Sequence, residues 1–172
     1  WREAVRTECI GVRDCVSVMD HGGFTKFEVR GPGAHAYLGR VFCGALPKPG
    51  RIRLGYMLTP NARLWSEATI AHVTPGKYLL CRPTVASDRD HDWLRGLLPV
   101  DGTVQLQYGA TRDGALMLMG PRSRALLQKL TDVDVSATAQ PWMSVLNIDV
   151  AGVPVTAMRV SYVGEFGWEL HV

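Results

Sequence analysis

Residues 24–41 read FTKFEVRGPGAHAYLGRV, and this stretch decides the fold. From Phe24 to Val29 apolar and polar residues alternate with period two, which predicts a strand. Gly31-Pro32 follows, and proline at the first helical position is already set for helix entry. Apolar residues at positions 34, 37, 38 and 41 then have helical spacing, so residues 33–42 are expected to form a helix.

The same unit occurs again further along the chain. Residues 116–118 lead into Gly120-Pro121, and a second helix is expected to follow. Its apolar face would be Ala125, Leu126, Leu127 and Leu130. Residues 29–41, VRGPGAHAYLGRV, and residues 118–130, LMGPRSRALLQKL, agree in type at most positions. Two copies are too few for a solenoid, so the repeat predicts a pair of related strand–turn–helix units.

Most other segments read as strands joined in hairpins. Residues 54–59 and 64–73 flank the turn at 60–62, and residues 143–150 and 153–163 flank Ala151-Gly152. Further strands are expected at 77–81, 103–108 and 166–172, and helices at 1–14 and 85–97, the latter with Thr84 as its N-cap. The predicted class is therefore α+β with mainly antiparallel sheets.

Composition excludes several classes of function. The 172 residues are 47% hydrophobic and 20% charged, with a formal net charge of +3. No basic block suggests a nucleic-acid surface, and no apolar run has the length of a membrane span. The four cysteines (Cys9, Cys15, Cys43, Cys81) and five histidines lack metal-ligand spacing. We expect no metal, reduced and mostly buried thiols, and solvated histidines.

The usual cofactor motifs are missing. There is no G-x-G-x-x-G, P-loop, H-E-x-x-H or G-x-S-x-G, so this chain should not bind FAD or NAD through a Rossmann turn of its own. The most unusual segment is residues 159–170, RVSYVGEFGWEL, where two glycines flank Glu165 in a broken strand. Such glycines bring backbone close to another group and leave the carboxylate at a bend. An ordinary turn with a solvated glutamate fits this pattern as well.

Several motifs together resemble one family. RVSYVGEFGWEL resembles the signature R-x-(S/T)-Y-(T/V)-G-E-x-G-(W/Y/F)-E-(L/I) of the folate-dependent aminomethyltransferases. Residues 24–41, residues 49–58 (PGRIRLGYML) and residues 120–136 (GPRSRALLQKLTDVDVS) resemble further motifs of that family in the same order. The match runs from about Glu3 to Val172 and is nearest to the dimethylglycine and sarcosine dehydrogenase branch.

The resemblance implies a fold and a function. Residues 1–172 would be part of a cloverleaf folate-binding domain, two intertwined α+β subdomains without the C-terminal barrel. In that branch a separate FAD domain oxidises an N-methyl amine to an iminium, and this domain passes the one-carbon unit to tetrahydrofolate. The location would be the cytoplasm, or the mitochondrial matrix in a eukaryote. Two alternatives stay open: a non-catalytic folate-binding regulatory module, and a tetrahydrofolate-dependent S- or O-demethylase.

The resemblance also implies site residues. Glu165 would accept the two parallel donors of the pterin edge, the ring N–H and the 2-amino group. Tyr162 would close the same pocket. Ser66 stands where the glycine-cleavage transferases have the first Asp of G-G-(I/V)-x-D-D-L-x-V, and Glu67 is the acid beside it. We expect Ser66 to contact the cofactor and Glu67 to be the catalytic base, although Glu67 also fits a solvated strand residue. Asp20 reads as a structural cap.

Overall fold

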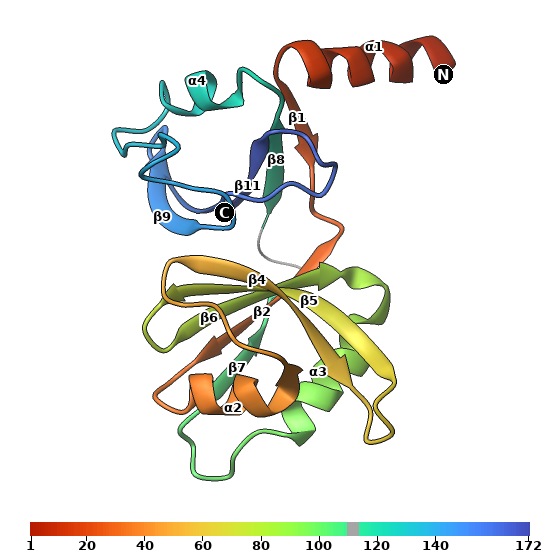
Figure 1. The fold of residues 1–172 in the computed structure, drawn as a ribbon, viewed down its shortest axis with the longest axis vertical. Coiled ribbons are helices and arrows are strands. Elements are labelled where there is room, and N and C mark those ends of the chain that lie inside the picture. The colour runs from red at the N-terminus through yellow and green to blue at the C-terminus, as the bar shows by residue number, and fades with distance from the viewer. Residues whose placement is uncertain (110–113) are drawn as a thin grey trace. The chain divides into compact units, whose positions relative to one another are not determined.

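The computed structural model describes residues 1–109 and 114–172 of the chain. Figure 1 shows the elements, which fall into two compact units that are each described by themselves. One unit is continuous in sequence, Gly23–Asp113, and is called the inserted unit below. The other combines Trp1–Gly22 with Gly114–Val172 and is called the split unit. No described helix is both long and apolar enough to cross a membrane.

The inserted unit is a six-stranded antiparallel sheet with two helices on one face (Figure 1). The strand order is β3-β4-β5-β6-β2-β7. In chain order its elements are β2 (Phe24–Arg30), α2 (Ala34–Val41), β3 (Phe42–Cys43), β4 (Arg51–Leu58), β5 (Leu64–Thr74), β6 (Lys77–Pro83), the 3₁₀ turn η1 (Thr84–Ala86), α3 (Ser87–Gly96) and β7 (Gln105–Tyr108). The apolar faces that the sequence predicts for these strands and helices form its core. There, Tyr37 and Leu38 of α2 and Leu94 of α3 pack against Phe27 and Ile70 of the sheet.

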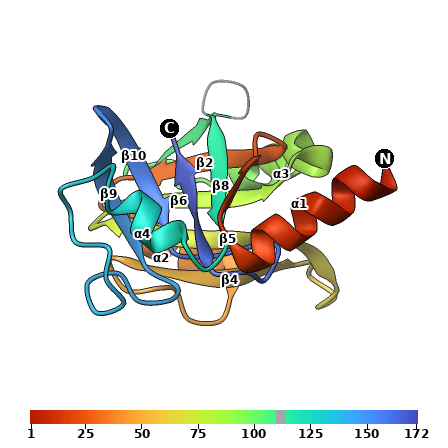
Figure 2. The same ribbon diagram turned by 90° about the horizontal axis from the view of Figure 1, so that it is seen from above.

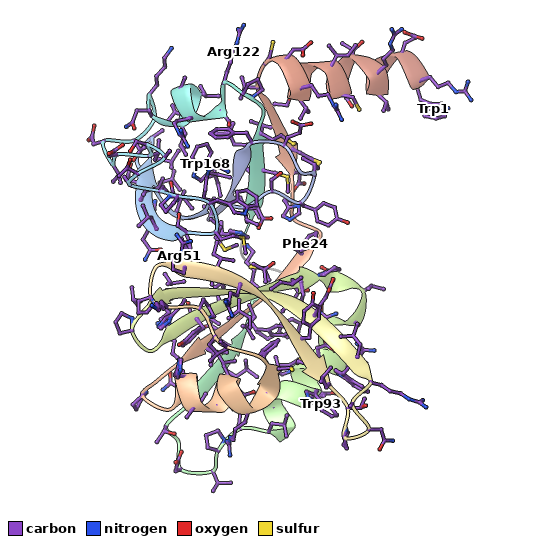
Figure 3. All side chains as sticks on the ribbon, viewed as in Figure 1. Trp1, Phe24, Arg51, Trp93, Arg122 and Trp168 are labelled. Carbon is purple, nitrogen blue, oxygen red and sulfur yellow. The ribbon has the colours of Figure 1, made fainter. Side chains whose placement is uncertain are left out.

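The split unit is a five-stranded antiparallel sheet in the order β1-β8-β11-β10-β9. Its elements are α1 (Arg2–Asp14), β1 (Ser17–Asp20), β8 (Ala115–Met119), α4 (Ser123–Leu127), β9 (Val145–Val150), β10 (Val153–Met158) and β11 (Gly167–His171). Trp168, labelled in Figure 3, is fully buried, and its indole Nε1 donates to Gln140 Oε1 over 2.8 Å. Helix α1 extends away from β1 with no buried residue (Figure 2).

The two Gly-Pro turns have the same geometry in both units. Gly31 has φ 122° and Gly120 has φ 111°, values that favour glycine. A Cβ at Gly31 would lie 2.2 Å from the Thr103 carbonyl oxygen, and one at Gly120 would lie 2.6 Å from the Cys15 carbonyl oxygen. Each glycine carbonyl then accepts a hydrogen bond from the backbone N–H three residues on, at the start of the following helix. The sequence repeat is therefore a structural repeat.

The α+β class with antiparallel sheets is confirmed, but several predicted boundaries are wrong: the strand expected over 54–59, for example, begins at Arg51. Thr84 is not an N-cap, because its hydroxyl donates to the Gly23 carbonyl at 2.7 Å and α3 begins at Ser87. The second repeat helix stops at Leu127, and the side-chain Nε2 of the next residue, Gln128, donates to the carbonyls of Thr131 and Val133. The strand expected over residues 153–163 ends at Met158.

Burial corrects two further expectations. Three of the four free cysteines are exposed, and Cys81 alone is buried. Three of the five histidines, His21, His72 and His171, are buried instead of solvated. His72, for example, donates from Nδ1 to the Pro47 carbonyl at 3.0 Å and stacks on Tyr78 at a centroid distance of 4.0 Å.

Candidate functional site

The loop between β10 and β11 carries Glu165 and Tyr162. It leaves the sheet after Met158 and returns at Gly167. Gly164 has φ 83°, and a Cβ at Gly167 would lie only 2.1 Å from the Leu118 carbonyl oxygen. Both glycines are therefore required by the backbone path, one by its conformation and one by close approach to β8. The loop holds the Glu165 side chain at 31% exposure, so its carboxylate is partly desolvated yet reachable.

Glu165 lines a groove of the split unit. The groove has a volume of about 800 Å³ and lies between α1, β1, the end of β8 and the loop. Its lining includes Glu8, Arg13, Met19, Met119 and Glu165. Arg13 Nε lies 3.5 Å from Glu165 Oε1, but the Arg13 side chain is 77% exposed. An ion pair so exposed is worth about 0–1 kcal/mol, so it leaves the carboxylate open to a better donor.

Tyr162 lies on the same loop but is not among the residues that line the groove. Its side chain is exposed, and its ring makes a tilted contact with His21 at a centroid distance of 6.0 Å. The structure therefore places Tyr162 and Glu165 on one loop with different neighbours.

Sequence reasoning missed a buried acid between two histidines. Glu169 Oε1 lies 3.7 Å from His21 Nε2, and Glu169 Oε2 lies 3.3 Å from His171 Nε2. All three side chains are buried. The signal was present in residues 167–171, GWELH, because period-two alternation puts Glu169 and His171 on the face opposite Trp168. The contribution of His21 from β1's end has no such signal.

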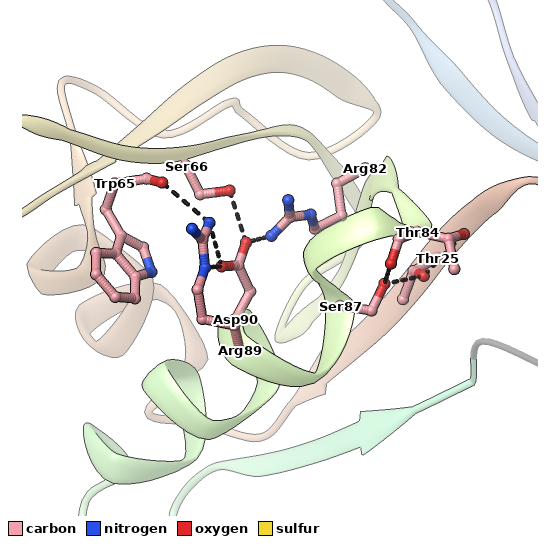
Figure 4. A network of polar contacts seen from close by, with 8 residues as sticks. All are labelled: Thr25, Trp65, Ser66, Arg82, Thr84, Ser87, Arg89 and Asp90. Atoms are coloured by element: carbon pink, nitrogen blue, oxygen red, sulfur yellow. Dashed lines mark hydrogen bonds and ion pairs between the residues drawn. The ribbon is translucent and has the colours of Figure 1, made fainter.

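Ser66 belongs to a buried polar network in the inserted unit (Figure 4). Its hydroxyl donates to Asp90 Oδ2 at 2.6 Å, and Asp90 is fully buried. Arg82 forms an ion pair with the same carboxylate, and Arg89 Nη2 lies 3.1 Å from Oδ1. Burial lowers the pKa of Arg82, and Arg89 lowers it further, whereas Glu67 raises it. The Ser66 hydroxyl is thus committed to the carboxylate that neutralises Arg82.

Glu67 points to the opposite face of β5. Ser66 is buried on the side of α3, whereas Glu67 is exposed and lies in register opposite Tyr56 of β4. The exposed side chains of Leu54, Tyr56 and Leu58 follow β4 on that same face. Of the two adjacent residues, only Glu67 offers its functional group to a ligand in this conformation.

Asp20 has the structural role that the sequence suggests. Its Oδ1 accepts a hydrogen bond from the Gly22 backbone at 2.7 Å and so closes the turn after β1.

A second groove, of about 540 Å³, lies in the inserted unit beside His35, His72 and Tyr78. The Tyr78 hydroxyl and His35 Nδ1 bond each other at 2.7 Å. Burial raises the pKa of Tyr78, so the phenol keeps its proton in this position. The groove contains none of the expected site residues.

Comparisons with known proteins identify the family of the chain. The model of the GCVT N-terminal domain matches residues 1–172. The chain is 34% identical over 172 residues to mitochondrial dimethylglycine dehydrogenase of Homo sapiens, covering 99% of this chain and 20% of that protein. It is 29% identical over 170 residues to aminomethyltransferase of Geobacillus kaustophilus, covering 98% of this chain and 46% of that one.

The fold has a close counterpart among solved structures. The crystal structure of glycine cleavage system aminomethyltransferase T from Bartonella henselae superposes with a TM-score of 0.82 at 20% identity, covering 96% of this chain and 44% of that one. The chain spans about a fifth of the length of the dimethylglycine dehydrogenases that it matches. Because the family model matches its whole length, the chain belongs to the GCVT N-terminal domain family.

Proposed function

We propose that this chain is a tetrahydrofolate-binding, one-carbon-transfer domain of a dimethylglycine or sarcosine dehydrogenase-like oxidoreductase. The relatives named above support the reaction class, and the FAD-dependent oxidation would belong to another domain or chain. The observation that carries the proposal is the half-buried Glu165 carboxylate at the side of a groove large enough for a bicyclic ring.

The groove suits a reduced pterin chemically. Glu165 has two oxygens, and a pterin edge has two parallel donors, so the pair can form a charge-assisted bidentate contact. Met19 and Met119 give the groove adaptable apolar surface for a ring face. Arg13 is the present neighbour of the carboxylate, and its exposed ion pair is weak enough to be displaced. Tyr162 does not line the groove in this structure, so its proposed contact with the bound ring requires its side chain to turn toward Glu165.

Glu67 is the proposed base. Tetrahydrofolate supplies the amine nitrogens that accept the one-carbon unit, and Glu67 takes the proton released when such a nitrogen bonds to the iminium carbon. Its exposure on β5 leaves the carboxylate free for this role. Ser66 contributes to the cofactor directly only if its hydroxyl leaves Asp90. Otherwise it supports the strand that carries Glu67.

The test is a tetrahydrofolate titration of the protein that carries this chain. We expect Glu165→Gln to weaken binding about 10- to 150-fold, the range for hydrogen bonds to a charged group worth about 1.5–3 kcal/mol. Glu8→Gln is the matched control, because Glu8 lines the same groove from α1. It should change the Kd less than about twofold, a shift of about 0.4 kcal/mol. Equal affinities of wild type and Glu165→Gln would remove the basis of the proposal.

Product analysis separates the remaining readings. Methylene-tetrahydrofolate is the expected product when the N-methyl amine is oxidised in the same reaction. Methyl-tetrahydrofolate would instead indicate an S- or O-demethylase. Folate binding without any product would indicate a regulatory module.

A further inference from the structure

Arg159 is buried without an acidic partner. It is the first residue of the β10–β11 loop and only 6% exposed. No ion pair of Arg159 occurs among residues 1–109 and 114–172. Its guanidinium carbon instead lies 4.1 Å from the ring centre of Phe166 and 4.7 Å from that of Trp168. Burial lowers the pKa of Arg159, and the nearby Arg124 lowers it further, yet arginine remains charged at neutral pH.

This buried charge needs an explanation other than stability. A guanidinium removed from water loses hydration, and an apolar side chain of similar volume fills a core without that penalty. Stacking on aromatic faces recovers only part of it. Since no carboxylate among the described residues neutralises Arg159, its contribution must come from what the guanidinium holds.

Arg159 ties together the two ends of the loop that carries Glu165. Its backbone is fixed by the Arg159 N–H to the Ser144 carbonyl at 2.8 Å and by the Met143 N–H to the Arg159 carbonyl at 2.9 Å. Its side chain then reaches forward eight residues, where Nη1 donates to the Gly167 carbonyl at 2.7 Å. The guanidinium thus spans the loop from its first residue to the residue where β11 begins.

The residues that Arg159 contacts directly follow Glu165 in the chain. Phe166, on which the guanidinium stacks, follows Glu165 in the chain. The Phe166 carbonyl also accepts a hydrogen bond from the Gly120 backbone at 2.7 Å. Phe166 and Gly167 thus fix the chain directly after Glu165, and the residue before it, Gly164, has a left-handed conformation.

We propose that Arg159 is a positioning residue, which closes the β10–β11 loop so that the Glu165 carboxylate is aimed into its groove. The inference rests on the proposed function, because it assumes that Glu165 binds the ligand of that groove. Arg159 acts through Glu165 and does not touch the ligand itself.

A double-mutant cycle in the intact protein tests this role. Tetrahydrofolate Kd is measured for Arg159→Met, Glu165→Gln and the double variant, with thermal unfolding followed in parallel. We expect Arg159→Met to weaken binding about tenfold, within the range of coupling between interacting residues. The double variant should bind as weakly as Glu165→Gln alone, because positioning the side chain at 165 no longer matters once its carboxylate is gone. A purely structural role would not give this non-additivity.

Two further variants keep the test decisive. Arg159→Lys retains a donor and a charge and should recover part of the affinity. This variant also takes the place of Arg159→Met in the cycle if the methionine variant does not fold. Arg124→Met is the matched control: its guanidinium also stacks on Phe166, at 4.8 Å, but among the described residues it donates to no loop carbonyl. It should leave Kd within about twofold, well below typical coupling effects.

The outcomes distinguish the two proposals. Unchanged affinity in Glu165→Gln overturns the proposed function. Weakened affinity in Glu165→Gln with wild-type affinity in both Arg159 variants, or with fully additive losses, overturns only the positioning role. An equal loss in Arg124→Met would also overturn it, because removing a nearby cation would then be enough.

Discussion

The two units each bury an arginine, but the partners of the guanidinium group differ between them. In the inserted unit Arg82 pairs with the fully buried Asp90, which Ser66 and Arg89 also contact. In the split unit Arg159 has aromatic faces and one carbonyl instead. The first arrangement balances charge inside a scaffold, so breaking it should affect folding. The second spans a loop beside a groove, so breaking it should affect binding more than folding.

The largest effect should follow from breaking the charge balance of the inserted unit. Arg82→Met leaves the Asp90 carboxylate buried with Arg89 as its only cation among the residues that the structure describes, and Arg89 is half exposed. We expect the free energy of unfolding to fall by about 3 kcal/mol, as for other buried pairs that lose one partner. Urea denaturation followed by circular dichroism measures it.

The control for that variant is Asp92→Asn on the same helix. The Asp92 side chain is 82% exposed, so its loss should change stability by less than about 0.5 kcal/mol. A loss below about 1 kcal/mol in Arg82→Met would mean that Arg89 alone neutralises Asp90, and the contrast between the units would weaken.

Ser66→Ala should have an intermediate effect. Asp90 loses a hydrogen bond from a neutral donor, and the expected destabilisation is about 1–2 kcal/mol. If Ser66 acts only through Asp90, tetrahydrofolate affinity stays at the wild-type value. A tenfold rise in Kd without a matching loss of stability would instead establish Ser66 as a direct contact of the cofactor.

Alkaline pH gives a smaller, sign-specific test. Burial raises the pKa of Tyr37 despite an opposing contribution from Arg40, and its hydroxyl donates to the Leu94 carbonyl at 2.7 Å. The folded state therefore keeps this proton where the unfolded state loses it. That stabilisation is fully present below about pH 10, the unfolded pKa, and declines as the pH rises above it.

In Tyr37→Phe, the free energy of unfolding should accordingly fall less steeply above about pH 10 than in the wild type. At neutral pH the lost hydrogen bond should lower the free energy of unfolding by about 1 kcal/mol. Burial also raises the pKa of Tyr78, so some slope should remain. Identical slopes in wild type and Tyr37→Phe would contradict the assignment.

The smallest change in stability is expected for Arg159→Met. Relief of the desolvation penalty should offset the lost hydrogen bond to Gly167, so the free energy of unfolding should change by about 1 kcal/mol or less. Chemical denaturation of the ligand-free protein measures it. A loss as large as that of Arg82→Met would show that both arginines serve the scaffold, and the difference between the units would disappear.

The parts of the fold that the sequence predicted are those with local causes. Gly31 and Gly120 have a positive φ and lie close to a backbone carbonyl. Only glycine meets both requirements, so the turns are visible in the sequence. Alternating strands and the α2 helix carry their own periodicity. Thr84 failed as a cap because its hydroxyl meets the Gly23 carbonyl, 61 residues away, which no local pattern contains.

The sequence proposes the residues of the candidate site one by one, but it does not contain the neighbours that the structure gives them. The glycines around Glu165 mark an unusual bend, and alternation puts Ser66 and Glu67 on opposite faces of one strand. Which face is interior depends on Asp90, 24 residues later in the chain. The hydrogen bond from Arg159 to the Gly167 carbonyl likewise forms only when the loop folds back on itself. No helix or strand periodicity in the sequence links two loop residues that are eight positions apart.

The order of synthesis places a constraint on the split unit. Strand β1 pairs with β8, which begins nearly a hundred residues later at Ala115. On the ribosome the inserted unit therefore emerges with all its strands before β1 has any partner. The nascent chain must carry β1 as an open edge throughout that interval, exposed to mispairing or to chaperones.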